Sequence, residues 1–341
     1  MKQTEIIDVL IPSFRDLAYV YECIAHLQAS SICSDLNVVV LNNDNKIHQN
    51  DFKIEQGDLR SLIIIDIGYN SGYGYALNKG ISLTNSNYIF VCNSDVFVDK
   101  TYLEKLINFF KDKEEVGQIT GKILRYDFRK HKKTDIIDTT GLVMYRNRRV
   151  VDRGAGEVDK GQFFDGDVFG ISGAATLIKR HALSTICIDG EYYDENMFMY
   201  KEDVDLSWRL LLAGWKSYYF KDAIAYHCRT STGLEDKPYL TNITSFIDNE
   251  SRKKEYVKIQ SMKNQWLLLI KNEQAQNAII DGIFIVFREG LVLIHNLIFS
   301  PKLSFISIKM FYFQLSSTLK KRRLIQSKSK LSANEFRRLL S

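Results

Sequence analysis

The chain has 341 residues, of which 45% are hydrophobic and 26% are charged, and its formal net charge is +5. This length and composition are those of an ordinary folded protein with one large or two modest domains. Three prolines are too few for a proline-rich linker, and five cysteines without a CxxC spacing argue against a disulfide framework or a zinc cage.

The amino-terminal residues and the cysteines indicate a cytoplasmic protein. The opening stretch MKQTEIIDVLIPSF lacks the long apolar core and the cleavage site of a signal peptide. Unpaired cysteines are typical of a reducing compartment. Most of the excess of positive charge lies near the end of the chain, after residue 319, and it lacks a pattern of interleaved aromatic stacking residues, so we expect no nucleic-acid partner.

Apolar runs alternate with helical patterns over the first 112 residues. Continuous runs of this kind are typical of strands that are covered on both faces of a sheet. The predicted strands are 8–14, 36–44, 61–68 and 87–95, and the predicted helices are 16–30, 73–84 and 101–112. This alternation predicts an α/β domain with a mainly parallel, Rossmann-like central sheet.

Small polar residues follow each of the four predicted strands. These positions lie at the carboxyl edge of a parallel sheet, where ligands bind. One such turn is ordinary turn chemistry, but four in succession predict a shared pocket. The turns are Pro12-Ser13, Asn42-Asn43-Asp44, Asn70-Ser71-Gly72 and Asn93-Ser94-Asp95. Gly72 would either let the backbone approach a ligand closely or serve only a tight turn.

Two residues have the chemistry of a divalent-metal site. Asp95 ends the fourth predicted strand, and a carboxylate at a strand tip suits Mg²⁺ or Mn²⁺. His227 follows a short apolar run and would be a second ligand if it faces Asp95. The alternatives are a turn-forming aspartate and a structural histidine.

The pattern is less regular between residues 120 and 235. Seven glycines between positions 141 and 173 predict an irregular half that closes over the sheet edge. Residues 172–183 predict a strand that enters a helix. The stretch YKEDVDLSWRL, residues 200–210, predicts a helix that begins with Glu202 and Asp203. Acidic residues suit the positive end of a helix dipole, so this pair is either a cap or a working base.

Beyond residue 240, apolar helices precede a basic tail. Asp281, Arg288 and Glu289 interrupt the apolar run 278–299, which disfavours a clean membrane span. Apolar helices followed by basic residues favour a helix that lies in the membrane surface. A helical subdomain packed on the sheet and a homodimer contact are the alternatives.

The order and spacing of these motifs resemble the family 2 glycosyltransferases, and within them the rhamnosyltransferase-like branch of bacterial polysaccharide assembly. The resemblance spans residues 6–235. It is carried by VLIPSF, VVVLNND, NSGYGYALNKG, CNSDV, SGAATLIKR and AIAYHCRTS, and most specifically by DENMFMYKEDVDLSWR followed by AGW. It implies a GT-A fold over residues 1–240, with a nucleotide-sugar half at 1–118 and a catalytic and acceptor half at 119–240. Residues 241–341 would form a helical, basic, membrane-associating region.

The resemblance also implies roles for individual residues. The donor-binding residues would be Pro12, Ser13, Asn42, Asp44, Asn70, Gly72, Asn93, Ser94, Gly173 and Ala174. Asp95 and His227 match the residues that hold a divalent metal, Mg²⁺ or Mn²⁺. Asn42 and Asn93 replace acids that the family usually has, which leaves the nucleotide preference open. Asp44 would compensate for Asn42.

Glu202 and Asp203 match the acidic pair of the family, with Asp203 as the base that takes a proton from an acceptor hydroxyl. Trp208 would stack on the acceptor sugar, unless it belongs to the core. The resemblance therefore implies an inverting glycosyltransferase, peripheral on the cytoplasmic membrane, that extends an O-antigen, capsule or similar lipid-linked glycan. The expected donor is dTDP-rhamnose. The alternatives are a UDP-sugar donor (galactofuranose, hexose or N-acetylglucosamine) and a non-catalytic sugar-binding scaffold.

Overall fold

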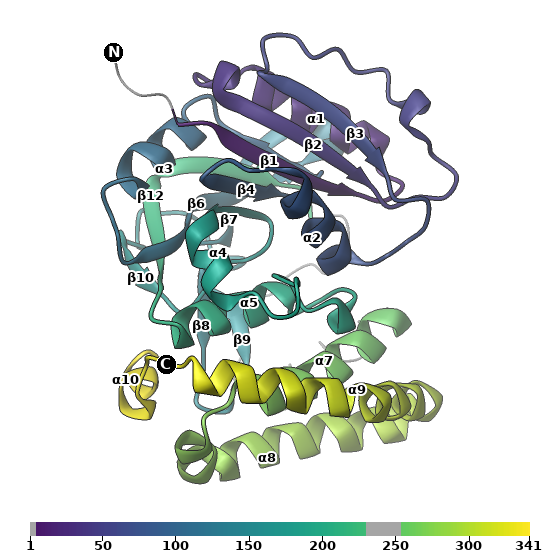
Figure 1. Cartoon of the computed structure of the whole chain (residues 1–341), viewed down its shortest axis with the longest axis vertical. Coiled ribbons are helices and arrows are strands. Elements are labelled where there is room, and N and C mark those ends of the chain that lie inside the picture. Colours follow the sequence, from purple (N-terminus) through teal and green to yellow (C-terminus); the bar gives the residue numbers. More distant parts are fainter. Residues whose placement is uncertain (1–4, 230–253) are drawn as a thin grey trace.

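The computed structural model describes residues 5–229 and 254–341 (Figure 1). Its strands are β1 Ile7–Ser13, β2 Leu36–Asn42, β3 Ser61–Asp66, β4 Tyr88–Cys92, β5 Val96–Val98, β6 Val116–Asp127, β7 Lys132–Thr139, β8 Leu142–Met144, β9 Val150–Asp152, β10 Gly166–Val168, β11 Ala175–Lys179 and β12 Lys216–His227. Its α-helices are α1 Leu17–Gln28, α2 Tyr73–Leu83, α3 Tyr102–Phe110, α4 Arg180–Ile186, α5 Glu202–Leu212, α7 Glu255–Asn272, α8 Ala275–Phe299, α9 Pro301–Ser327 and α10 Ala333–Arg338.

The central sheet is mixed, with a parallel amino-terminal half. Its strand order is β10-β12-β6-β11-β4-β1-β2-β3. Strands β3, β2, β1 and β4 are parallel, β11 runs antiparallel between β4 and β6, and β12 is parallel to β6. The four strands and three helices predicted for residues 8–112 are confirmed within a few residues at each end.

Helices cover both faces of this sheet, as the continuous apolar runs require. Side chains alternate along each strand, so that Val9 and Val38 face the core beneath α1 and α3, while Leu10 and Val39 face the core beneath α2, α4 and α5. The result is a three-layer α/β arrangement whose strand ends remain uncovered by these helices.

The half predicted to be irregular is more ordered than expected. Residues 116–227 add β6, β11 and β12 to the sheet rather than only closing over its edge. The polar residues inside β6 concealed this strand, because each is satisfied within the core. Gln118 donates to the hydroxyl groups of Ser207 and Ser217 at 2.9 and 2.8 Å, and Thr120 donates to the Ala175 carbonyl at 2.8 Å.

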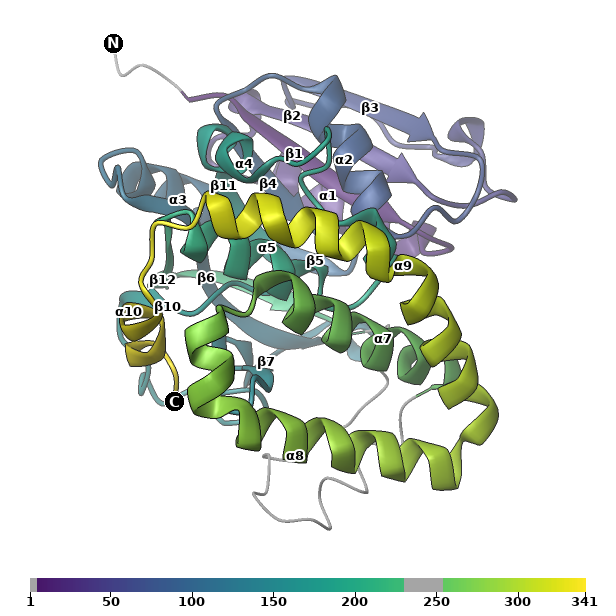
Figure 2. The same cartoon turned by 60° about the horizontal axis from the view of Figure 1, so that its bottom comes forward.

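The carboxyl-terminal helices pack against α5 on the side away from the sheet (Figures 1 and 2). Their apolar contacts to α5 come from Leu268 of α7, Ile325 of α9 and Phe336 of α10. A helical extension was predicted, and its contact with the sheet domain runs through α5. The predicted boundary at residue 240 lies outside the described residues.

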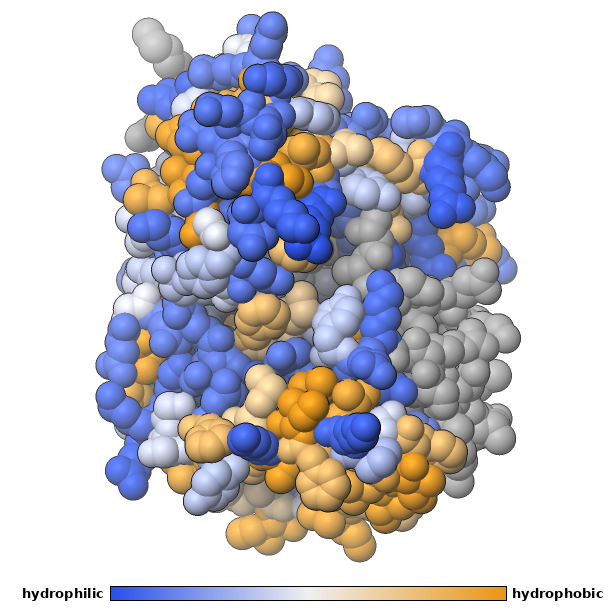
Figure 3. Space-filling model, turned by 90° about the vertical axis from the view of Figure 1, so that its right-hand side faces the viewer, coloured by the Kyte–Doolittle hydropathy of each residue, from blue (hydrophilic) through white to orange (hydrophobic). Residues whose placement is uncertain are grey.

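Helix α8 presents an exposed apolar face. Among the described residues it is the one helix long and apolar enough to cross a membrane, and only 17% of its most apolar window is buried. Figure 3 shows apolar side chains gathered at the end of the molecule where α8 lies. Exposed members on α8 and α9 include Ile279, Ile283, Val286, Phe287, Ile298, Phe299, Phe305, Tyr312 and Phe313. Length and composition alone do not place this helix in a membrane, so membrane association stays a prediction.

Candidate active site

The carboxyl ends of β1, β2 and β3 lie in register, so their polar residues meet at one edge of the sheet. Ser13 is level with Asn42, and Asn42 is level with Asp66. The Asn43 N–H donates to the Ser13 carbonyl at 2.8 Å, and Asn43 Oδ1 accepts from the Ser71 hydroxyl at 2.6 Å. The structure thus brings the first three predicted turns together.

Asn42 and Asp44 are both engaged within this edge. Asn42 Nδ2 donates to Asp66 Oδ1 at 2.8 Å, and Asn42 Oδ1 accepts from the Asp44 N–H at 3.2 Å. Burial pushes the Asp44 pKa up, but hydrogen bonds from the Lys46 N–H and from Arg15, at 3.1 Å, hold that pKa below its usual range. Asp44 is therefore an ionised carboxylate where the predicted pocket needs one.

Three further donor candidates differ in their surroundings. Pro12 is buried at the end of β1, and Asn70 is exposed, with Oδ1 accepting from the Gly72 N–H at 3.3 Å. Gly72 has a φ of +86°, and a Cβ there would lie 2.5 Å from the Phe198 carbonyl oxygen. Only glycine fits this position, and the close approach that it permits is to the chain itself.

Asp95 and His227 lie side by side because β12 pairs with β5. His227 Nε2 is 3.1 Å from Asp95 Oδ1, and His227 Nδ1 is 2.8 Å from Asp138 Oδ2. Burial lowers the His227 pKa, but the charges of Asp95 and Asp138 raise it to about 10. Arg229 contacts Asp138 in turn. The imidazole is held between two carboxylates.

The donor set of this pair fits a divalent cation that replaces the Nε2 proton of His227, because only a neutral imidazole can bind a metal. Cis ligands of an octahedral ion with bonds of about 2.1 Å lie about 3 Å apart, which is close to the separation of Asp95 and His227. In the described part of the chain, no group of three His, Cys, Asp or Glu side chains is placed to hold a metal ion. Mg²⁺ commonly takes one or two carboxylates and fills its shell with phosphate and water oxygens. Asp138 would orient the imidazole through its other nitrogen.

Asp16 is a further carboxylate in this region that the sequence analysis missed. Its two oxygens accept from the Ser13 hydroxyl, at 2.6 Å, and from the Ser94 hydroxyl. Burial raises the Asp16 pKa, the two hydroxyl groups oppose that rise, and the charge of Asp95 adds to it. Asp16 immediately precedes α1, where an aspartate is an ordinary cap, so its position did not distinguish it.

A short hydrogen-bonded relay connects Asp203 to the fourth predicted turn. The Gly173 N–H donates to Asp203 Oδ2 at 3.0 Å. The Tyr73 hydroxyl lies 2.9 Å from both the Gly173 carbonyl and Asn93 Oδ1. The Asn93 N–H donates to the Ala174 carbonyl at 2.9 Å. The acidic pair and the predicted metal residues therefore lie on the same side of the molecule.

Three carboxyl groups of this region, those of Glu202, Asp203 and Asp152, have raised pKa values. Burial, followed by the charge of Asp203, raises the Glu202 pKa to about 8. Burial raises the Asp203 pKa against the hydrogen bonds that two backbone N–H groups donate to it. Burial also raises the Asp152 pKa to about 6, Arg229 opposes the rise, and Asp138 and Asp203 add to it. Carboxylates with pKa values near neutrality suit a general base.

The loop before the acidic pair has an uncommon backbone conformation. Phe198, Tyr200 and Lys201 have φ values of 59°, 69° and 70°, and such residues cost about 1–3 kcal/mol each. The Tyr73 N–H donates to the Phe198 carbonyl at 2.7 Å. From the opposite side, Asn264 Nδ2 of α7 lies within 2.8 Å of three loop carbonyls. Helices α2 and α7 thus hold this loop between them.

The expectation that Trp208 contacts the acceptor is wrong. Its side chain is 0% exposed, and its ring stacks on Phe336 of α10 at 5.4 Å. Helix α5 is buried on both sides, and Trp208 lies on the side that the carboxyl-terminal helices cover. Tyr200 and Tyr256 are two of the aromatic residues close to the acidic pair; their rings are 6.4 Å apart, and Tyr256 is 43% exposed.

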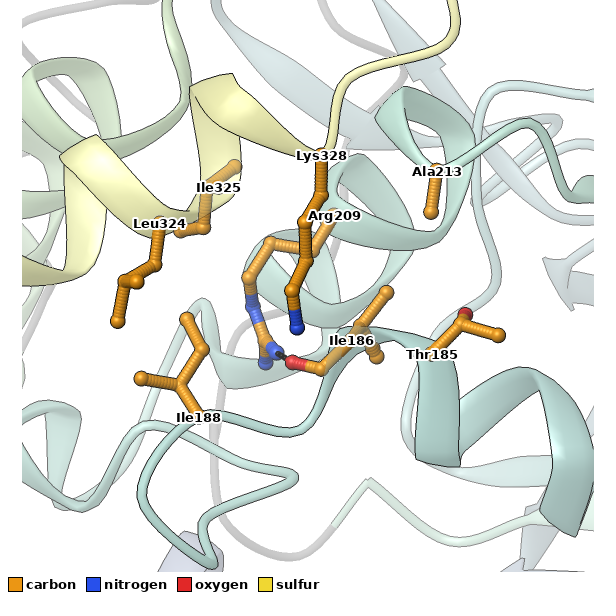
Figure 4. Close-up of a pocket in the computed structure, with 8 residues that line it drawn as sticks. All are labelled: Thr185, Ile186, Ile188, Arg209, Ala213, Leu324, Ile325 and Lys328. Carbon is orange, nitrogen blue, oxygen red and sulfur yellow. Dashed lines mark hydrogen bonds between the residues drawn. The ribbon is translucent and has the colours of Figure 1, made fainter.

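A small pocket lies between α4, α5 and α9, away from this region (Figure 4). Arg209 crosses it and donates to the Ile186 carbonyl at 3.1 Å. Its other wall is formed by Leu324 of α9 and by Lys328, which directly follows that helix. None of the predicted site residues lines it, so it is a packing gap between helices and not part of the candidate site.

Comparisons with known proteins agree with this arrangement. A family model described as glycosyl transferase family 2 matches residues 8–186. A poly-beta-1,6-N-acetyl-D-glucosamine synthase of Staphylococcus aureus (strain COL) is 29% identical over 168 residues, which cover 49% of this chain and 36% of the relative. An N-acetylglucosaminyltransferase of Azorhizobium caulinodans is 22% identical over 64% of this chain and 54% of its own length. The chain thus spans about a third to a half of these curated relatives.

The fold is shared with solved glycosyltransferases. A mannosyltransferase from Pyrobaculum calidifontis, in complex with GDP-Man and Mn²⁺, matches with a TM-score of 0.52 at 10% identity. The match covers 96% of this chain and 86% of that chain. The predicted GT-A fold is confirmed.

Proposed function

Because the chain belongs to glycosyl transferase family 2, we propose that it transfers a sugar, with inversion, from a nucleotide-diphosphate donor to a hydroxyl group of a glycan acceptor. The observation that carries the proposal is the relay from Asp203 through Gly173 and Tyr73 to Asn93. The relay supports the proposal because it links Asp203 to the turn that ends in Asp95, and a transfer between two bound substrates needs a proton acceptor and a cation site in one region.

The donor lies along the carboxyl edge of the sheet. Ser13, Asp44 and Asn70 stand at the turns that would bind the nucleoside, and Asp44 supplies the carboxylate that Asn42 lacks. Gly173 and Ala174 stand between this edge and α5, where they would border the sugar. A divalent cation held by Asp95 and His227 would offset the charge that grows on the leaving diphosphate.

The proton leaves the acceptor hydroxyl as its oxygen attacks the anomeric carbon, and the bond from that carbon to the diphosphate breaks. Asp203 takes the proton, because two backbone N–H groups fix its carboxylate and its pKa is raised. Glu202 remains beside it, with Oε2 buried and without a hydrogen-bond partner among the described residues.

For the donor sugar and the acceptor we propose a class of compound and not a single one. The names of the relatives favour N-acetylglucosamine, whereas the motif resemblance favours rhamnose from dTDP-rhamnose, so both belong in the first donor screen. The exposed apolar face of α8 favours a peripheral position on the inner leaflet of the cytoplasmic membrane and a lipid-linked glycan as the acceptor.

The test is a transfer and donor-hydrolysis assay with Mn²⁺ and four donors: UDP-N-acetylglucosamine, UDP-galactofuranose, UDP-glucose and dTDP-rhamnose. Asp203→Asn should lower kcat by about 10²–10⁴-fold. Asp112→Asn, at an exposed acid, is the control and should leave kcat unchanged. A scaffold without catalysis, the alternative that Asn42 and Asn93 suggest, would turn over none of the four donors. It would also tolerate Asp203→Asn in the host pathway, and that result would overturn the proposal.

A further inference from the structure

A polar pocket separates α7 from α8, close to the acidic pair. Residues 258, 261, 262 and 265 line it from one face of α7, and residues 288, 289, 292 and 296 line it from the facing side of α8. Figure 2 shows α8 standing apart from α7, with α9 connecting the far end of α8 back to the sheet domain. We call this space the α7–α8 pocket.

The pocket has an excess of positive charge. Lys201, Lys258 and Arg288 line it, against one carboxylate, Glu289, which contacts Arg288. Within residues 5–229 and 254–341, the hydrogen bond of the Lys258 ammonium group is a long one of 3.5 Å to Ser300. Lysine and arginine side chains that converge on a small space are the usual means of holding a phosphate group.

The wall of the pocket also offers a hydrogen-bond acceptor. Gln265 is 2% exposed and donates from Nε2 to the Arg148 carbonyl at 3.3 Å. Its Oε1 has no hydrogen-bond partner among the described residues. A buried carbonyl oxygen without a hydrogen-bond donor costs free energy. A ligand hydroxyl that donates to this oxygen would remove that cost. Cations and an amide oxygen together suit a phosphorylated sugar.

Two observations connect the pocket to catalysis. Lys201 lines it and directly precedes Glu202, and the Lys201 charge opposes part of the rise in the Asp203 pKa that burial causes. Tyr200 and Tyr256, whose rings pack together, stand at the same loop and at the start of α7. A ligand held in the pocket therefore lies within electrostatic reach of the base.

The outer face of α8 is apolar beside this polar interior. Phe287 and Val286 are 69% and 71% exposed and adjoin Arg288, which lines the pocket. Helix α8 thus presents hydrocarbon on one side and, on the other, the polar wall of the pocket with Arg288. A ligand that combines an anionic head with a long apolar chain matches both sides.

We propose that the α7–α8 pocket is the acceptor-anchoring site and binds the phosphate group that joins the acceptor glycan to its lipid. The lipid chain runs along the outer face of α8, and the glycan extends toward Asp203. This inference rests on the proposed function, whose acceptor class it specifies. Lys258 and Arg288 hold the phosphate, and Gln265 accepts from a sugar hydroxyl.

The experiment compares two synthetic acceptors with the full chain in neutral detergent. One carries N-acetylglucosamine on a dodecyl chain through a diphosphate, and the other carries the same sugar directly on dodecanol. The double variant Lys258→Met, Arg288→Met should raise the KM for the diphosphate acceptor about 10–100-fold, because two charge-assisted contacts are lost. The KM for the phosphate-free acceptor should not change. The control Lys302→Met, Lys309→Met removes two exposed cations of α9 outside the pocket and should change neither KM.

Vesicle flotation separates an acceptor phosphate from a bilayer headgroup. Suppose that the double variant loses binding to phosphatidylglycerol vesicles while the KM for the diphosphate acceptor stays constant. In that case the pocket binds the phosphate of a bilayer headgroup, and the proposal that it binds the acceptor is overturned. Equal KM values for both acceptors in both proteins would overturn any phosphate site here. If the wild type transfers sugar to neither acceptor, that result counts against the proposed function and not against the pocket. Calorimetric titration with dodecyl diphosphate then tests the pocket independently, because loss of binding in the double variant would still support it.

Discussion

Asn264 is the residue whose replacement should most clearly separate positioning from stability. The change Asn264→Leu keeps the size of a buried side chain that is 0% exposed, and it removes the amide beside three carbonyls of the loop before Glu202. An amide has two N–H groups, and a buried hydrogen bond contributes about 0.5–1.5 kcal/mol net. We therefore expect a loss of about 1–3 kcal/mol in the free energy of unfolding.

The effect on catalysis should exceed the effect on stability. Phe198, Tyr200 and Lys201 hold left-handed conformations that only the surrounding contacts sustain. Once the amide is gone, the loop relaxes and carries the acidic pair with it. A displacement of about 1 Å at a reacting group costs about 10²-fold in rate, so kcat should fall by about that factor.

The assay measures kcat, both KM values and urea unfolding for two variants. Asn277→Leu is the matched control, because Asn277 is also 0% exposed but, among the described residues, donates to Gln274 at the start of α8, at 3.3 Å, and not to the loop. It should lose stability with kcat unchanged. The reasoning would be refuted if folded Asn264→Leu kept the wild-type kcat, or if both variants lost kcat in proportion to their stability.

Other predictions concern the acidic pair, the core and the buried ions. The folded-state pKa of Glu202, about 8, lies above its usual 4.5, so stability should fall as pH rises between these values, and Glu202→Gln should flatten the dependence of Tm on pH. Trp208→Ala should cost about 3–5 kcal/mol in urea unfolding and leave the acceptor KM unchanged; a raised KM would return this residue to the acceptor site. Lys271→Met deprives the buried Asp205 of a contact at 2.9 Å and should cost about 3–5 kcal/mol, whereas Lys320→Met, at an exposed pair, should cost at most about 1 kcal/mol; equal losses would contradict the buried-charge argument.

The amino-terminal half was predictable because its signals are local. Each of β1 to β4 is a short apolar run that ends in small polar residues, and each helix between them shows its own periodicity. Strand β6 was not predictable in this way. Its interior Gln118 and Thr120 look like surface residues until Ser207, Ser217 and the Ala175 carbonyl are seen to satisfy them.

Parts of the candidate site depend on contacts that no local pattern encodes. Asp138 lies 89 residues before His227, and Asn264 lies 67 residues after Met197. Neither stands in a recognisable motif, so only the folded chain reveals that they hold the imidazole and the loop. The expectation that Trp208 contacts the acceptor was wrong for a related reason. Periodicity can mark the apolar face of a helix, but α5 is buried on both sides, and the sequence does not say which neighbour covers which side.

The burial of α5 on both sides has a practical consequence for dissecting this enzyme. Cutting the chain before α7 would leave Trp208 and Leu211 bare to water and Asp205 without the Lys271 ammonium group. A fragment that ends near residue 229 would therefore not be a minimal catalyst. The carboxyl-terminal helices complete the core that supports α5 and the acidic pair at its start. The sheet domain and these helices should therefore unfold in a single calorimetric transition.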